Sequence, residues 1–160
     1  LNSVLYIGGC TSSDSGFLLG GRFPAPTYLS DITKFAFASD TTFSDHADLN
    51  YGISGPAGVN SDTSGYALGA GNPSQPNTHS NIQKFPFASQ TNATEVGEID
   101  AVTYGSSASS STQSGYTAGG NTASDGPNNK IRKFPFASDG DSTDVGNLAT
   151  GTGYGASAQY

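Results

Sequence analysis

The chain has no tryptophan, no methionine and a single cysteine, and only six of its 160 residues are Lys or Arg. Because Cys10 stands alone, an intrachain disulfide and metal sites built on paired cysteines are excluded. The formal net charge of -7 opposes binding to a phosphate backbone, because nucleic-acid affinity depends largely on Lys and Arg. We therefore expect no nucleic-acid partner.

Long apolar runs are also missing. No run of about 18 apolar residues occurs, so we expect no membrane insertion through a helix. Apolar residues make up 34% of the chain, and its 22 glycines sit among many Ser, Thr, Asn and Asp, which is the chemistry of turns. The composition predicts one domain with many short strands and almost no helix.

One segment of the sequence occurs three times. It is Ile-x-Lys-Phe-x-Phe-Ala-Ser followed by Asp or Gln, at 32–40, 82–90 and 131–139, so the offsets are 50 and 49 residues. A Ser-Gly-aromatic element keeps the same phase and ends at Phe17, Tyr66 and Tyr116. An acidic segment that ends at Leu49, Ile99 and Leu148 recurs with the same offsets of 50 and 49 residues. Repeats of this length indicate an array of similar units.

We divide the single repeat domain 1–160 into units 1–49, 50–99 and 100–148, with the start of a fourth unit at 149–160. Each unit is predicted to form four short strands. Alternation along the third strand places the paired Phe side chains, such as Phe35 and Phe37, on one face as the anchor of the core. Pro86 and Pro135 are expected at an edge, a strand end or a bulge. The segment 72–81 is expected to be an exposed loop.

A period near 50 with four strands and a Gly-Gly pair, as at Gly20 and Gly21, resembles a kelch-type β-propeller blade. The resemblance covers three units and lacks the Trp that such blades usually carry late in the unit. It implies an all-β fold of kelch-like β-propeller blades, completed by other subunits or by further blades of a longer array.

A second resemblance is carried by Lys-Phe-Pro-Phe-Ala-Ser-Asp at 133–139, Thr-Asp-Val-Gly-Asn-Leu at 143–148 and Gly-Tyr-Thr-Ala-Gly-Gly at 115–120. These motifs are similar to repeat proteins of tailed phages, which are taken for virion structural or tail-fibre components. The resemblance implies a viral structural protein in the virion or an extracellular setting. It supplies no site residues.

Three repeats alone would leave apolar sheet faces and strand edges in water. We expect the partner to be the chain itself, in a ring or a filament, or neighbouring virion proteins. A fragment of a longer array is the alternative to the ring and the filament, and the two assemblies together are favoured over it. The chain could also present loops for attachment to a host surface or a cell-surface glycan.

Few residues offer catalytic or metal chemistry. The acidic pairs Asp45 with Asp48 and Glu95 with Glu98 could hold Ca²⁺, but solvated turns are favoured. His46 and His79 fall in different phases and are interpreted as surface residues, and Cys10 as a packed, unreactive thiol. We expect no catalytic residue, no metal, no cofactor and no enzyme activity.

Recurring Lys and Tyr residues are the remaining candidates. Lys34, Lys84 and Lys133 could face an anionic ligand, although stems that cover the Phe pairs are favoured. Tyr51, Tyr104 and Tyr154 lie in roughly corresponding segments and could stack on sugar rings, one weak site per repeat. The alternatives to a fibre are therefore a soluble lectin-like oligomer and, less favoured, a propeller enzyme.

Overall fold

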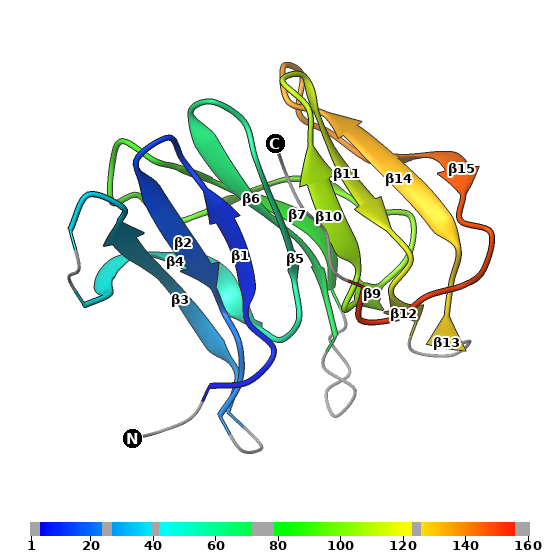
Figure 1. Ribbon diagram of the computed structural model, residues 1–160, viewed down its shortest axis with the longest axis horizontal. Coiled ribbons are helices and arrows are strands. Elements are labelled where there is room, and N and C mark those ends of the chain that lie inside the picture. The colour runs from blue at the N-terminus through cyan, green and yellow to red at the C-terminus, as the bar shows by residue number, and fades with distance from the viewer. Residues whose placement is uncertain (1–3, 24–26, 40–41, 72–78, 123–125, 156–160) are drawn as a thin grey trace.

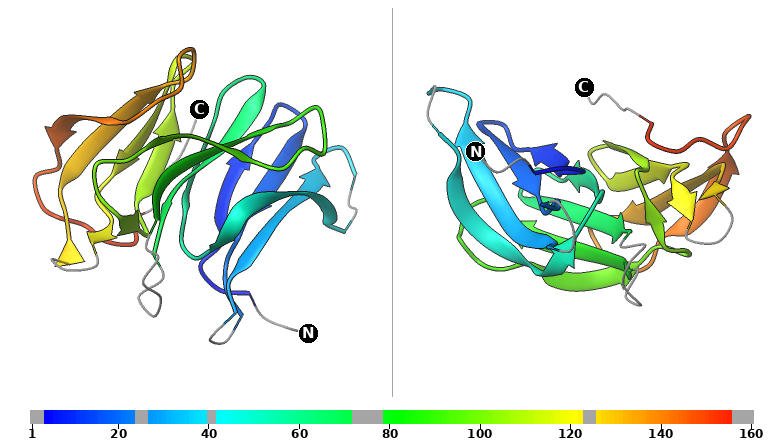
Figure 2. Two further views of the ribbon diagram at one scale, coloured as in Figure 1. Left: turned by 180° about the vertical axis from the view of Figure 1, so that it is seen from behind. Right: turned by 90° about the horizontal axis from the view of Figure 1, so that it is seen from below.

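The computed structural model describes residues 4–23, 27–39, 42–71, 79–122 and 126–155, and these residues form strands and turns without a helix. Three four-stranded antiparallel sheets lie side by side in chain order (Figure 1). The views from behind and from below show the same succession of sheets (Figure 2). Within the described ranges, no helix of the length and apolarity needed to cross a bilayer is present.

Each large sheet is a meander in which consecutive strands pair. The first sheet contains β1 (Gly8–Thr11), β2 (Ser15–Leu19), β3 (Leu29–Ala36) and β4 (Ser44–Ile53). The second contains β5 (Ala57–Asn60), β6 (Ser64–Ala70), β7 (His79–Pro86) and β8 (Thr94–Glu98). The third contains β10 (Ser107–Ser110), β11 (Ser114–Ala118), β14 (Lys130–Pro135) and β15 (Thr143–Asn147).

A small additional sheet lies beside the third one. It contains β9 (Thr103–Tyr104), β12 (Asn121–Thr122) and β13 (Gly126–Pro127), in the order β13-β12-β9. The prediction of an all-β chain with four strands per unit is confirmed. One boundary differs, because β4 continues to Ile53, four residues beyond the predicted end of the first unit at Leu49.

The glycine of the Ser-Gly-aromatic element pairs with the first Phe of the neighbouring strand in every sheet. The register pairs are Gly16 with Phe35, Gly65 with Phe85, and Gly115 with Phe134. In each case a Cβ added to the glycine would lie 2.3–2.4 Å from the Phe ring. The ring therefore lies flat across the glycine backbone, and this links the two repeated motifs physically.

The aromatic residue after that glycine points to the opposite face of its sheet, because strand side chains alternate. The ring centroid of Phe17 in the first sheet lies 5.5 Å from that of Phe85 and 4.9 Å from that of Phe87 in the second repeat unit. Tyr66 of the second sheet lies 5.3 Å from Phe134 and 5.0 Å from Phe136 of the third. The same aromatic junction thus joins each sheet to the next.

Two buried clusters fill these junctions. The first cluster includes Cys10, Phe17, Leu19 and Phe85, and the second includes Val59, Tyr66, Leu68 and Phe134. Each cluster draws side chains from two consecutive sheets. A single sheet of this chain therefore has no complete core of its own.

The Phe pair of the first sheet departs from the prediction that it anchors the core. Phe35 is half-buried, and Phe37 is 53% exposed. No preceding sheet is present to cover this face in the described structure. The pairs in the second and third sheets do lie against the preceding sheet, so the prediction is right for two units and wrong for the first.

The structure tests the predicted places of the prolines, and only part of the predicted loop lies within the described residues. Pro86 and Pro135 are the last residues of β7 and β14, which confirms their placement at strand ends. Of the predicted loop 72–81, residues 72–78 lie outside the described residues, and 79–81 belong to β7. Of the predicted start of a fourth unit at 149–160, residues 156–160 also lie outside them.

Candidate functional site

A chain of backbone hydrogen bonds joins the sheets at one end of the molecule. Tyr6, Gly55, Gly105 and Tyr154 occupy the same phase of the repeat, and all four have a positive φ, of 55°, 67°, 64° and 56°. The Gly55 N–H donates to the Tyr6 carbonyl at 2.7 Å, Gly105 donates to Gly55 at 3.1 Å, and Tyr154 donates to Gly105 at 2.8 Å. This left-handed position is suited to glycine, so the two tyrosines there are unusual.

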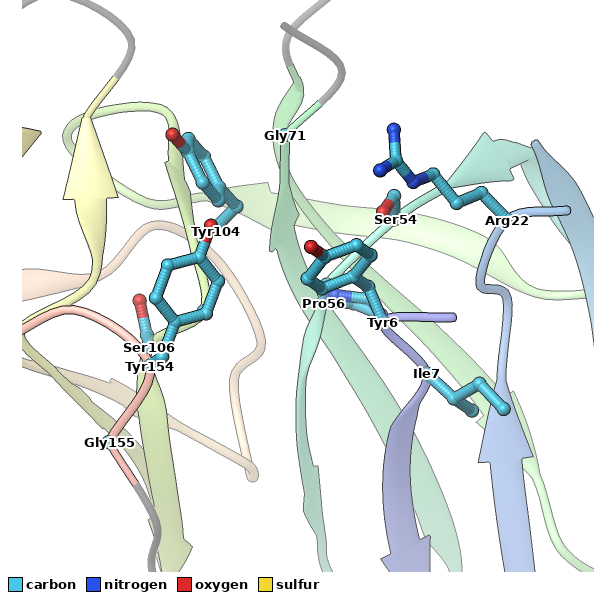
Figure 3. A pocket seen from close by; sticks show the side chains of 12 residues that line it. Tyr6, Ile7, Arg22, Ser54, Pro56, Gly71, Tyr104, Ser106, Tyr154 and Gly155 are labelled. Carbon is cyan, nitrogen blue, oxygen red and sulfur yellow. The ribbon is translucent and has the colours of Figure 1, made fainter. Parts of the chain in front are cut away.

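A pocket of about 420 Å³ opens beside this chain of hydrogen bonds. Its lining comes from segments that precede or follow the inner strands, and it includes Tyr6, Arg22, Ser54, Tyr104, Ser106 and Tyr154. Figure 3 shows Tyr6 and Arg22 on one side of the pocket and Tyr104 and Tyr154 on the other. The pocket therefore collects residues from all three repeat units.

The tyrosine rings form a connected group. The Tyr6 and Tyr154 ring centroids are 6.3 Å apart, and the Tyr104 and Tyr154 centroids are 6.1 Å apart. Tyr6 and Tyr154 are exposed, the latter by 62%. Exposed aromatic faces with hydroxyl tips combine an apolar stacking surface with hydrogen-bonding capacity.

Arg22 brings a positive charge to this group. Its guanidinium carbon lies 5.0 Å from the centroid of the Tyr6 ring, in a cation–π arrangement. Its Nε atom is buried and has no hydrogen-bond partner among the described residues. A guanidinium has five donors and no acceptor, so Arg22, which lines the pocket, offers N–H donors to an oxygen-rich ligand.

The surroundings of Tyr154 influence its ionisation. Desolvation, together with the neighbouring phenols of Tyr104 and Tyr6, raises the pKa of Tyr154 above its ordinary value, although Arg22 opposes the shift. The Tyr154 hydroxyl therefore remains protonated at neutral pH. It is available as both a donor and an acceptor for a ligand hydroxyl.

Tyr51 lies elsewhere, so the structure brings together only two of the three tyrosines proposed from the sequence. The Tyr51 ring stacks on His79 at 3.7 Å, and its hydroxyl donates to Asn81. Desolvation and the charges of Glu95 and Glu98 raise its pKa. Tyr104 and Tyr154 line one pocket together with residues of the other units, and Tyr51 does not line it.

Sequence reasoning missed Tyr6 and Arg22. Tyr6 corresponds in phase to Tyr154, and both stand where the internal units have Gly55 and Gly105. That substitution of Tyr for Gly was a readable signal. Arg22 gave no such signal, since its approach to Tyr6 depends on a bridge between the Leu5 and Arg22 backbones.

The other sequence candidates have structural roles. Exposed Asp48 and Glu98 accept hydrogen bonds from Ser30 and Ser80, and no group of three metal-ligating side chains occurs in the part of the chain that the structure describes. Burial raises the pKa of the Cys10 thiol to about 12, which leaves almost no thiolate at neutral pH.

The interpretation of His46 as a surface residue is wrong. It is buried at the first junction, edge-on to Phe17, and its Nε2 lies 3.1 Å from the Pro86 carbonyl. His79 is half-buried against Tyr51. Both rings fill space between strands.

The recurring lysines cover aromatic rings. Their Nζ atoms lie 5.6, 5.6 and 5.9 Å from the centroids of Phe17, Tyr66 and Tyr116 for Lys34, Lys84 and Lys133 respectively. Lys84 also forms an ion pair with Asp139 of the third sheet at 3.0 Å. The lysine side chains were predicted to cover the Phe pairs. They lie instead over the aromatic residue of the Ser-Gly-aromatic element in each sheet.

No family model and no curated protein matches the chain. Among solved structures, the chain is similar to YjhT, with a TM-score of 0.72 and 10% sequence identity. The likeness covers 92% of this chain and 53% of that one, so the chain spans about half the length of this structural neighbour. At this identity the comparison supports a shared all-β fold and nothing further.

Proposed function

We propose that this chain is a non-enzymatic structural repeat protein of a phage virion or extracellular fibre, and that it attaches to surface glycans through the pocket formed by Tyr6, Tyr104, Tyr154 and Arg22. Its sheets would be kelch-like propeller blades. The observation that carries the binding role is the convergence of three tyrosines and one arginine from different repeats on a single pocket.

The propeller interpretation is supported by the arrangement of the sheets. Three four-stranded meanders follow one another in chain order, and a continuous series of backbone hydrogen bonds links their inner ends. Radial repetition of such sheets is how propellers protect their apolar faces. The likeness to YjhT agrees with this interpretation at the level of the fold.

The glycan role is supported by the chemistry of the pocket lining. Sugar rings present C–H faces that pack on aromatic side chains and hydroxyls that need donors and acceptors. Tyr6, Tyr104 and Tyr154 offer both. The positive charge of Arg22 in the pocket lining favours a sugar that carries a carboxylate over a neutral one.

The soluble lectin-like oligomer is the second candidate, and the same pocket favours it. The two candidates differ in where the protein is found rather than in what the pocket binds. Detection of the chain in purified particles by mass spectrometry would support the virion role, and its absence from particles would favour the lectin.

The binding role is tested on glycan arrays that contain neutral and carboxylated sugars, followed by calorimetry with the best sugar. Tyr154→Ala should weaken binding by about tenfold, or about 1.4 kcal/mol, because it removes one aromatic face. Tyr154→Phe should retain most of the affinity. Arg22→Gln should weaken binding of carboxylated sugars and leave neutral sugars unchanged.

Thr63→Ala is the control, since Thr63 is exposed in the turn between β5 and β6, away from the pocket lining. It should bind as the wild type does. Equal affinity of wild type and Tyr154→Ala for every sugar would refute the glycan role. Turnover of any sugar, with loss of activity on mutation of the pocket, would refute the non-enzymatic role.

A further inference from the structure

The two outer sheets leave opposite halves of the aromatic junction without a partner. We define the head face as Phe35, Phe37 and Phe43 of the first sheet, and the tail face as Tyr116 and Val145 of the third. Phe37 and Phe43 are each 53% exposed, and Val145 is 51% exposed. Exposed apolar side chains gathered in this way indicate an interaction surface.

The molecule already contains two completed copies of this junction. At the first, Phe17 meets Phe85 edge-on at 61° and Phe87 stacked at 18°. At the second, Tyr66 meets Phe134 edge-on at 63° and stacks on Phe136 at 23°. Two independent pairs of sheets therefore use the same geometry.

The head face is already arranged as the buried Phe pairs are. The Phe35 and Phe37 centroids are 5.6 Å apart with an interplanar angle of 74°. The buried pairs have 5.8 Å and 77° for Phe85 with Phe87, and 5.5 Å and 83° for Phe134 with Phe136. The exposed rings need no rearrangement to receive an aromatic partner, which lowers the entropic cost of binding.

The tail face also keeps the geometry of its buried counterparts. Lys133 Nζ lies 5.9 Å from the Tyr116 ring, as Lys84 Nζ lies 5.6 Å from the Tyr66 ring. Val145 corresponds in phase to Val96, which packs against the second buried cluster. The tail face thus presents the surface that the second sheet presents to the third.

We propose that a second copy of this chain docks its head face on the tail face of the first, with Phe37 stacked on Tyr116 and Phe35 edge-on to it. The partner is a second copy because each face has its complement at the other end of the same molecule, and the two internal junctions show how they fit. This contact is heterologous, so it builds a closed ring or an open filament. It is independent of glycan binding.

Sedimentation velocity and light scattering over a range of concentrations test the contact. Phe37→Asp and Tyr116→Asp should each weaken self-association by at least about tenfold, because each places a charge at the centre of an aromatic contact. Neither position is fully buried, so circular dichroism should show an unchanged fold. Thr63→Asp adds the same charge in a turn of the middle sheet and should associate as the wild type does.

Mixing the two variants distinguishes this contact from a symmetric one. Phe37→Asp keeps an intact tail face, and Tyr116→Asp keeps an intact head face. The mixture should therefore form a heterodimer through one intact contact and should grow no further. A fluorescent label on one variant makes the heterodimer visible in sedimentation.

Three results would overturn the proposal. The first is a wild-type chain that remains monomeric at the highest accessible concentration. The second is self-association that neither variant weakens. The third is loss of association in only one of the two variants, because a head-to-head contact would be broken by Phe37→Asp alone and a tail-to-tail contact by Tyr116→Asp alone.

Discussion

At the residue scale, the third unit carries a charged group that the other units lack. Arg132 is 1% exposed, and its Nε donates to Asp100, which also pairs with Lys130. The second unit has Gln83 at the same phase, and this side chain accepts the Asn50 N–H at 2.7 Å. The backbone of the repeat therefore accommodates either an amide or an ion pair.

The Asp100 group makes stability depend on pH. Burial opposes the charge of Asp100, but hydrogen bonds from Lys130 and Arg132 and their positive charges hold the pKa of this carboxyl below its usual 3.8. A lowered pKa in the folded state stabilises the protein above the unfolded-state pKa, and this contribution is lost as the pH falls through the folded-state value.

We expect Asp100→Asn to lower the free energy of unfolding at pH 7 by about 3 kcal/mol, because it leaves the Arg132 charge buried without a counter-charge. Below the unfolded-state pKa of about 3.8 the difference from the wild type should shrink, and it should be lost as the pH falls through the lower folded-state pKa of Asp100. Urea unfolding between pH 2 and pH 7 measures this. A difference that does not vary with pH would contradict the ion-pair role.

At the element scale, the glycine opposite the Phe ring decides whether neighbouring strands and sheets can approach. A Cβ on Gly65 would lie 2.3 Å from the Phe85 ring and 2.9 Å from the Cys10 sulfur. Neither group can move away, because both belong to the first buried cluster. The glycine of the Ser-Gly-aromatic motif is thus required by packing.

We expect Gly65→Ala to lower the free energy of unfolding by about 1–3 kcal/mol through overpacking. Gly146→Ala in β15 is the matched control, since an added Cβ there has no atom within 4 Å. Its effect should stay within about 0.5 kcal/mol. Chemical denaturation of both variants checks this, and equal effects would mean that the Phe85 ring does not depend on the glycine.

At the scale of the whole molecule, stability comes from junctions between sheets rather than from the sheets themselves. Tyr66 and Tyr116 occupy the same position of the repeat, but Tyr66 is buried at a junction and Tyr116 is half-buried on the tail face. Repeat arrays of this kind derive their stability from nearest-neighbour interfaces.

We therefore expect Tyr66→Ala to destabilise the chain by about 3–5 kcal/mol, as for other large-to-small core changes, and Tyr116→Ala to cost less than half as much. Urea unfolding should be measured at concentrations low enough to keep the chain monomeric. Equal losses for the two variants would show that each sheet is stable on its own and that the junctions contribute little.

The repeat, its phase and the four strands of each unit could be read from the sequence, because alternation and turn residues act over a few positions. The first Phe of each pair lies in the predicted strand, but β3, β7 and β14 each end one residue before the second Phe. The burial of that pair was predicted for all three units, although it depends on whether a preceding sheet is present. Phe134 and Phe136 of the third unit are therefore buried, whereas Phe37 of the first unit is exposed.

The candidate site was only partly predictable. Tyr104 and Tyr154 were selected because exposed tyrosines suit sugar faces, and they do line one pocket. Tyr51 was grouped with them by approximate phase, but its position in β4 places it against His79. Tyr6 is linked to the second unit by the Gly55 N–H, and Arg22 is held beside Tyr6 by its backbone bridge to Leu5 within the first unit.

The sequence by itself determined the period of the repeat, the strand chemistry and the all-β class, because these depend on side-chain alternation and local turn preferences. Only the tertiary structure decided which aromatic rings are buried, which tyrosines meet and which faces remain open. Those outcomes depend on which sheet lies beside which. Nearly identical motifs therefore have different environments at the middle and at the two ends of the same chain.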